Sequence, residues 1–200
     1  MENPFIDLLK ERRSIYALGK NVPLSNEQIT ELVQKAIKES PTSFNSQTSR
    51  AVVLFGDSHD TLWDLTEAAL KVVIPEGQDF APTVGKLNSF RAGYATILFF
   101  EDMSIVKNLQ EQFALYADNF PVWSEQASGI AQHSVWTALA TENVGASLQH
   151  YNPLIDNVVH SEWNLSSDWK LRAQMPFGSI EAPAQDKEYM DDDERVLSFN

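Results

Sequence analysis

The segment YATILFFED at residues 94–102 constrains the fold more than any other part of the chain, because it carries almost no polar alternation. A strand with one face in water alternates polar and apolar side chains, so a strand of this composition has both faces covered. RAVVLF at 50–55 predicts a second buried strand, and WKLRAQMPFG at 169–178 predicts a third. Helical patterns separate these strands, so we expect an α+β fold with helices on both faces of a mixed sheet.

Apolar residues at helical spacing account for much of the remaining chain. A first helix begins near Pro4, and the clearest one lies within 23–40, where Ser25 and Gln28 have the spacing of a capping box and Pro41 follows. We expect further helices at 61–73, 105–117, 124–145 (capped by Ser124) and 153–163, loops at 40–49 and 75–85, and short strands at 146–151 and near the C-terminus. The small apolar middle of the helix at 124–145 favours burial in a core or at a subunit interface.

Composition narrows the class of protein. The 200 residues contain no linker, repeat or low-complexity tract, so we expect a single domain covering residues 1–200. The chain has no cysteine, no signal-peptide pattern and no apolar run long enough to span a bilayer, and we therefore expect a cytoplasmic protein. A net charge of −13 argues against nucleic acid and anionic membranes as partners.

Several common catalytic and nucleotide-binding motifs are absent from the sequence. The four histidines lack the H-E-x-x-H spacing of a zinc site, so we expect no metal, and no serine lies in a G-x-S-x-G context. The eight glycines form neither a G-x-G-x-x-G turn nor a P-loop. If this chain binds a nucleotide or a flavin, side chains must therefore hold the phosphate.

The only dense group of cations beside a hydroxyl is Arg12, Arg13 and Ser14, at the end of the first helix. Such a group either is a solvated cationic helix end that offsets the helix dipole, or grips a phosphate with planar guanidinium groups. The same two interpretations apply to Arg195, which follows the acidic run DDDE and has a salt bridge to that run as its simplest explanation.

Three further segments have both a structural and a ligand-binding interpretation. The polar loop at 41–47 is either a hydrated turn or a reader of the edges of a planar heterocycle. His150, in LQHYNP, either packs with one hydrogen bond or acts as a base. A group of aromatic residues forms either helical core or a wall over a flat ligand, and its members are Phe113, Tyr116, Phe120 and Trp123.

The order of these motifs resembles the nitroreductase family: RRS, then SPTSFNSQ, ALATENVGASLQHYNP, MPFG and a final ER. FFED and the block from FPVWSEQ to NPLID are similar to a small subgroup named after the yeast fatty-acid-repression-mutant protein and its bacterial relatives. The resemblance implies an α+β fold with a central mixed, mainly antiparallel sheet flanked by helices. It also implies an intertwined homodimer with FMN at the interface, where we expect the helix at 130–139.

The resemblance further implies an oxidoreductase in which NADH or NADPH reduces FMN. Reduced FMN then passes hydride from its N5 atom to a nitroaromatic, a quinone or a similar acceptor in the same pocket, by a ping-pong scheme. The cofactor carries that chemistry, so no catalytic side chain is expected. The alternative is a flavin-binding regulatory or stress-response protein with little turnover.

Site residues follow from the resemblance residue by residue. Arg12, Arg13, Ser14 and Arg195 match contacts to the FMN phosphate and ribityl chain, although Tyr16 stands where relatives usually carry another basic residue. The loop that approaches from the partner subunit matches Pro41, Thr42, Ser43, Asn45 and Gln47. The segment near flavin N5 matches Gln149, His150, Tyr151 and Asn152. Phe113, Phe120 and Trp123 are expected in the substrate pocket, and a central contact is left open among Lys86, Asn88 and Arg91.

Overall fold

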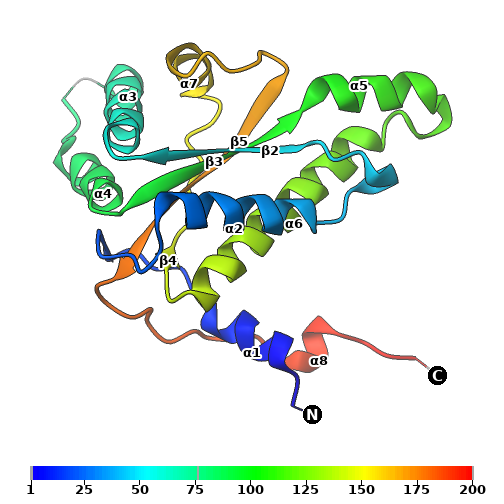
Figure 1. Cartoon of the computed structure of the whole chain (residues 1–200), viewed down its shortest axis with the longest axis horizontal. Coiled ribbons are helices and arrows are strands. Elements are labelled where there is room, and N and C mark those ends of the chain that lie inside the picture. The colour runs from blue at the N-terminus through cyan, green and yellow to red at the C-terminus, as the bar shows by residue number, and fades with distance from the viewer. Residues whose placement is uncertain (1, 76, 200) are drawn as a thin grey trace.

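The computed structural model describes residues 2–75 and 77–199, and an antiparallel sheet forms its centre (Figure 1). The strand order is β1–β5–β3–β2, and β4 pairs with β5 beside this path. The strands are β1 (Leu18–Gly19), β2 (Ser49–Phe55), β3 (Ala95–Asp102), β4 (Gly145–Ala146) and β5 (Trp169–Ile180). An isolated bridge between Ser14 and Ala146 adds a parallel pairing, so the expected mixed, mainly antiparallel sheet is confirmed.

Strand β3 lies between β2 and β5, and all eight of its residues are buried. This confirms the prediction that the segment at 94–102 is covered on both faces. Strand β2 pairs with β3 through one edge only, and its other edge has no partner strand in the described part of the chain.

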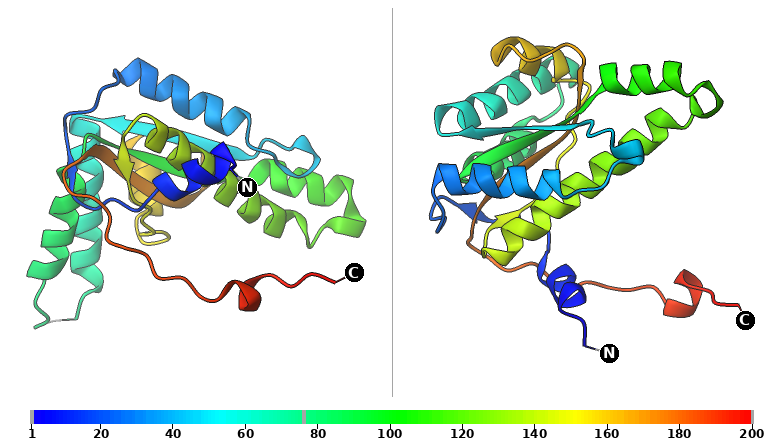
Figure 2. Two further views of the ribbon diagram at one scale, coloured as in Figure 1. Left: turned by 90° about the horizontal axis from the view of Figure 1, so that it is seen from below. Right: turned by 45° about the vertical axis from the view of Figure 1, so that its right-hand side comes forward.

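Helices cover both faces of the sheet (Figure 2). On one face, α2 and α6 pack against β3 and β5, and on the other face α3, α4 and α7 do so. The helices are α1 (Pro4–Glu11), α2 (Asn26–Lys38), α3 (Asp57–Val73), α4 (Ala81–Arg91), α5 (Met103–Gln112), α6 (Phe120–Thr141), α7 (Asp156–Glu162) and α8 (Asp192–Arg195). No described helix combines the length and the apolar character that crossing a bilayer requires.

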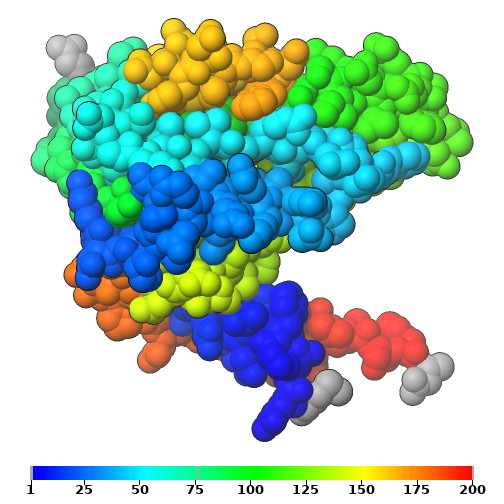
Figure 3. Space-filling model, viewed as in Figure 1, coloured from blue at the N-terminus to red at the C-terminus, as the bar shows by residue number. Residues whose placement is uncertain are grey.

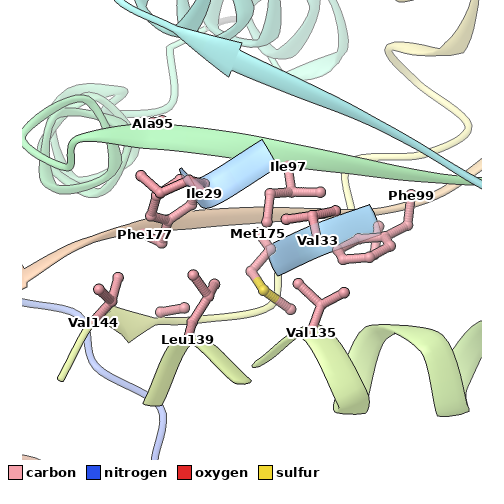
Figure 4. Packing of buried hydrophobic residues seen from close by; sticks show 12 residues of the cluster. Ile29, Val33, Ala95, Ile97, Phe99, Val135, Leu139, Val144, Met175 and Phe177 are labelled. Carbon is pink, nitrogen blue, oxygen red and sulfur yellow. The ribbon is translucent and has the colours of Figure 1, made fainter. Parts of the chain in front are cut away.

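Two apolar clusters form the core because β3 sends alternate side chains to opposite faces. Figure 4 shows the first cluster, in which Ile97 and Phe99 meet Val33 of α2 and Val135 and Leu139 of α6. The apolar middle of α6 is thus buried against its own sheet, which favours the core interpretation for Val135 and Leu139. Residue Ile130 lies on the opposite side of α6 and is exposed.

Several expected boundaries were wrong. Residues 81–85 are not loop but the start of α4, because Pro82 occupies the first turn of a helix. The helix expected at 124–145 is α6, which begins at Phe120, so Ser124 is an interior residue and not a cap. Helix α5 ends at Gln112, and only a short 3₁₀ turn (Ala114–Tyr116) follows it.

Two expected strands also differ. The strand expected at 146–151 is reduced to β4 and a single bridge at Gln149. The strand expected near the C-terminus is absent from the described residues, where the tail forms only the short helix α8. The helix expected at 153–163 starts at Asp156. The capping box of α2 is confirmed, with Ser25 and Gln28 bonding each other's backbone N–H groups.

We expect His59 to make stability depend on pH in the range below its unfolded pKa. Its ring is buried and contacts the hydroxyl of Thr96 at 2.8 Å and the carbonyl of Arg91 at 3.3 Å, and burial lowers its pKa below 6.5. The unfolded chain therefore binds a proton before the folded chain does. Stability should fall as pH drops below 6.5, by at most about 1.4 kcal/mol per pH unit. Denaturant unfolding of the parent and of His59→Gln at pH 7 and 5.5 measures the free energy of unfolding. The same loss between the two pH values in both proteins would contradict the prediction.

Candidate functional site

The segment at residues 12–14 leaves α1 and runs beside β4. Arg12 caps the C-terminus of α1 with an extended backbone, and Ser14 then forms the parallel bridge to Ala146. The N–H of Ile15 donates to the carbonyl of Ala146 at 2.9 Å. A Cβ on Gly145 would come within 2.9 Å of Ile15, so glycine at this position permits the close approach.

Arg12 has an unusual environment for a cation. Its guanidinium carbon lies 4.3 Å from the ring centroid of Trp136, and its buried Nε has no hydrogen-bond partner among the described residues. Burial lowers the pKa of Arg12, and the neighbouring Arg13 lowers it further. The ring of Trp136 holds the side chain in place, while its charge has no carboxylate within ion-pair distance in the described chain. Such a group is suited to receive an anion.

A cavity of about 580 Å³ opens at this point between the N-terminal segment and the C-terminal tail. Residues 12–17 form one side and residues 182–187 form the other. The guanidinium of Arg13 donates to the carbonyl of Gln185 at 2.5 Å, which ties the two sides together. Lys187 adds a third cation, one that the sequence did not suggest. The cavity therefore has three cationic residues, the carboxylate residue Asp186 and the hydroxyl residue Ser14 on its walls.

The segment at 149–152 follows β4 in the sequence and is held in place by hydrogen bonds to Gln174 of β5. Gln149 and Gln174 exchange two backbone hydrogen bonds, of 2.7 and 2.9 Å, and the N–H of Tyr151 donates to Oε1 of Gln174 at 2.7 Å. The N–H of His150 has no partner in the described hydrogen bonds. Gln174 is fully buried, and a polar residue between Ala173 and Met175 in the predicted strand was the signal for it.

The side chains of this segment differ in burial and in their contacts. Tyr151 points into the second apolar cluster, where its ring lies 6.0 Å from that of Trp63, and burial raises its pKa. His150 is exposed, and no described hydrogen bond involves its ring. Asn152 contacts Gln174 at 3.5 Å. The segment thus offers a backbone N–H at His150 rather than a packed histidine.

The polar loop at 41–47 has a strained backbone. Phe44, Asn45 and Gln47 have φ values of 57°, 50° and 51°, a region that residues other than glycine seldom occupy. Each such residue costs of order 1–3 kcal/mol and persists only where the surroundings enforce it. The N–H of Gln47 donates to Oγ1 of Thr42 at 2.9 Å and closes the loop. Strain of this kind concentrates at ligand-binding sites.

An aromatic cluster supports this loop. The ring of Phe44 lies within 6.4 Å of four other aromatic rings, which come from Phe113, Tyr116, Phe120 and Trp123. The loop and the aromatic group, two separate candidates in the sequence, are therefore brought together. Phe44 itself was missed, because an aromatic side chain in a polar loop gives no periodic signal. It remains 54% exposed, which leaves an aromatic face available to a ligand.

The loop and the residue 12–14 segment lie at opposite ends of α6. Phe44 stacks on Trp123, whereas Arg12 lies over Trp136, thirteen positions later in the same helix. At ~1.5 Å per residue the two contacts are about 20 Å apart. One chain therefore presents two separate groups of candidate residues, which we name half-sites and which do not meet within that chain.

The remaining candidates do not gather at either half-site. Arg195 lies in the exposed helix α8, which Figure 2 shows standing away from α1, and its side chain makes no described hydrogen bond or ion pair. Its convergence with Arg12 is not observed within one chain and stays a prediction. Arg91 is occupied, because it pairs with Asp64 and Glu67 at 2.8 Å and also bonds Asn88. Lys86 lies over the ring of Phe90.

Comparison with known proteins finds similarity along the whole chain. The sequence profile of the Nitroreductase family matches residues 9–179. HBN1 of Saccharomyces cerevisiae, a protein named as a nitroreductase, is 35% identical over 196 residues that cover 97% of both chains. Nitroreductase CinD from Lactococcus lactis, solved in complex with chloramphenicol, superposes with a TM-score of 0.90 and 55% identity over 98% of this chain and 100% of that one. A Desulfovibrio desulfuricans protein solved in complex with FMN shares the fold, with a TM-score of 0.69 and 20% identity over 100% and 99% of the two chains.

Proposed function

The chain belongs to the nitroreductase family of oxidoreductases, and on that premise we propose that it is an FMN-dependent NAD(P)H oxidoreductase. Its acceptors are nitroaromatics, quinones and similar flat molecules, and it works in the cytoplasm. Arg12 is the observation that carries this proposal. A half-buried guanidinium fixed over a tryptophan ring, with an unpartnered Nε, matches what binding a phosphate dianion requires.

The other groups in the cavity beside Arg12 fit the same cofactor. Arg13 and Lys187 supply further positive charge, and Ser14 supplies a hydroxyl for a phosphate or ribityl oxygen. These cations matter in a chain of net charge −13, which otherwise repels anions. The unpaired N–H of His150 is the donor that we assign to flavin N5.

We assign the second half of each site to the loop of a partner chain, in an intertwined homodimer. The separation of about 20 Å between the Trp123 and Trp136 contacts keeps the loop of one chain away from that chain's own Arg12. The tail after Ile180 supports the dimer, because it projects from the body and leaves an open recess beside it (Figure 3). Its apolar side chains are between 51% and 89% exposed: Tyr189, Met190, Val196, Leu197 and Phe199. The edge of β2 that has no partner strand in the described chain and the exposed side chain of Ile130 also support the dimer, because a second chain could cover them.

FMN, when bound, supplies the hydride chemistry between the nicotinamide donor and the acceptor. The protein's own residues bind, orient and exclude water. The cations at 12 and 13 neutralise the phosphate, and the aromatic cluster around Phe44 offers faces on which a flat acceptor can stack. Chloramphenicol, which CinD binds in its solved complex, is an acceptor of this kind to try.

The visible spectrum of the purified protein tests the proposal. We expect a yellow protein with bound FMN that bleaches when NADH or NADPH is added without oxygen and regains colour when a nitroaromatic follows. A yellow protein that no nicotinamide reduces would favour the alternative, a flavin-binding regulatory or stress-response protein. A colourless protein that gains no FMN on reconstitution would contradict both.

A further inference from the structure

Two adjacent carboxylates at the end of β3, Glu101 and Asp102, lie deep in the protein and have no part in the function proposed above. Glu101 is fully buried and Asp102 is 9% exposed. A buried carboxylate is costly unless it is hydrogen-bonded and near positive charge. The hydrogen-bond and ion-pair partners of these two carboxylates therefore indicate which parts of the structure the carboxylates hold together.

Glu101 bridges two elements of the candidate site. One carboxylate oxygen accepts the hydroxyl of Ser49 at 2.6 Å, and the other accepts the hydroxyl of Ser124 at 2.7 Å. Ser49 follows the strained loop by two positions, and Ser124 directly follows Trp123 of the aromatic cluster. One buried group thus joins the end of the loop to the helix on which Phe44 rests.

Asp102 strengthens the same connection. It pairs with Arg50 at 3.1 Å, and the guanidinium of Arg50 also donates to the carbonyl of Gln47 at 2.7 Å. The N–H of Asp102 donates to the carbonyl of Thr48 at 2.9 Å. The last residues of the loop are therefore tied to the end of β3 through both side chain and backbone.

A β-bulge places a cation in the neighbourhood of Glu101. Phe99 pairs with Ala173 and Phe100 pairs with Leu171, so Arg172 is the extra residue of β5. A bulge redirects a side chain that would otherwise point to the other face. Arg172 forms an ion pair with Glu125 of α6. Burial lowers the pKa of Arg172, and the charge of Glu101 partly opposes this lowering. A bulge and a buried cation at this position are a costly way to gain stability alone, because apolar side chains usually do as well.

We propose that Glu101 is a positioning residue that fixes loop 41–47 against the aromatic cluster, through Ser49 and Ser124, and thereby sets the acceptor pocket. The proposal rests on the proposed function, since the pocket is the one that a flat acceptor enters. The loop also contributes to the FMN site, so the test uses protein saturated with FMN and measures the acceptor alone.

The test measures binding of 4-nitrophenol to the oxidised protein saturated with FMN, through the change in flavin absorbance. Ser49→Ala and Ser124→Ala should each raise the dissociation constant about three- to tenfold, the loss expected for one hydrogen bond. Either change alone breaks the bridge. The dissociation constant of the double variant should therefore stay within about twofold of that of the single variant that binds 4-nitrophenol more weakly. Glu101→Leu, which can bond neither serine, should match the double variant if it folds.

Thr96→Val is the matched control, because the Thr96 hydroxyl is a buried hub on the same strand. It accepts from Nε1 of Trp63 at 3.2 Å and contacts His59, far from the loop. It should lower the melting temperature and leave the dissociation constant for 4-nitrophenol unchanged.

The outcomes separate this inference from the proposed function. A parent protein that holds no FMN overturns both. Unchanged 4-nitrophenol binding in the two serine variants of a yellow, NADH-reducible protein overturns the inference alone. Effects of the two serines that multiply, or an equal effect of Thr96→Val, also overturn it, because the carboxylate then would not act as a bridge.

Discussion

Replacing Arg12 with alanine is expected to weaken FMN binding by about 10- to 100-fold, which corresponds to the ~1.5–3 kcal/mol of a hydrogen bond to a charged group. The fold should survive, because the substitution breaks no ion pair in the described chain and removes only the contact of Arg12 with Trp136. Loss of the contact with Trp136 costs about 1 kcal/mol. Titration of the apoprotein with FMN, followed by flavin fluorescence, measures the affinity.

Two comparison variants sharpen this prediction. Arg12→Lys keeps the charge but loses the planar group over Trp136, so its affinity should lie between those of the parent and the alanine variant. Lys10→Ala removes a cation that is 68% exposed and paired with Asp7 one turn earlier, and it should bind FMN like the parent. If Lys10→Ala and Arg12→Ala weaken FMN binding equally, the effect comes from the net charge of the protein and not from a contact of Arg12. If Arg12→Ala binds FMN as the parent does, Arg12 is not part of the site.

The parts of the fold that the sequence predicted well have strong local signals. Strand β3 was identified because its residues do not alternate, and the start of α2 was identified because Ser25 and Gln28 satisfy each other's backbone. Helix α4 was missed because Pro82 and Gly85 suggested a loop, and only Leu87 and Phe90 are fully buried. A helix with so few core contacts leaves little periodicity to detect.

The candidate site was predictable in part. The loop at 41–47 and the aromatic group near 113–123 were both suspected, but their contact through Phe44 depends on how α6 crosses the sheet. The hydrogen bonds of Glu101 join β2, β3 and α6, which are distant in sequence, and no local pattern reveals the bulge at Arg172. Arg195 matched a motif, but it lies in the exposed helix α8 and makes no described hydrogen bond or ion pair, so its place in the site stays a prediction.

The central claim is that each FMN site combines Arg12 of one chain with the loop of its partner. It predicts that two defective chains complement each other. One carries Arg12→Ala, and the other carries Asn45→Gly with Gln47→Gly, which removes two polar side chains where glycine accepts the positive φ. Each homodimer should bind FMN weakly at both sites. In the mixed dimer both defects fall in one site, and the other site is intact.

The most direct measurement is the FMN content of that mixed dimer, obtained by co-expressing the two chains with different tags and purifying through both tags in turn. The account predicts roughly one FMN per dimer bound with the affinity of the parent protein, while every site of both homodimers binds FMN at least about tenfold more weakly. A mixed dimer in which both sites bind FMN as weakly as in the homodimers would contradict it, because both halves of each site would then belong to the same chain.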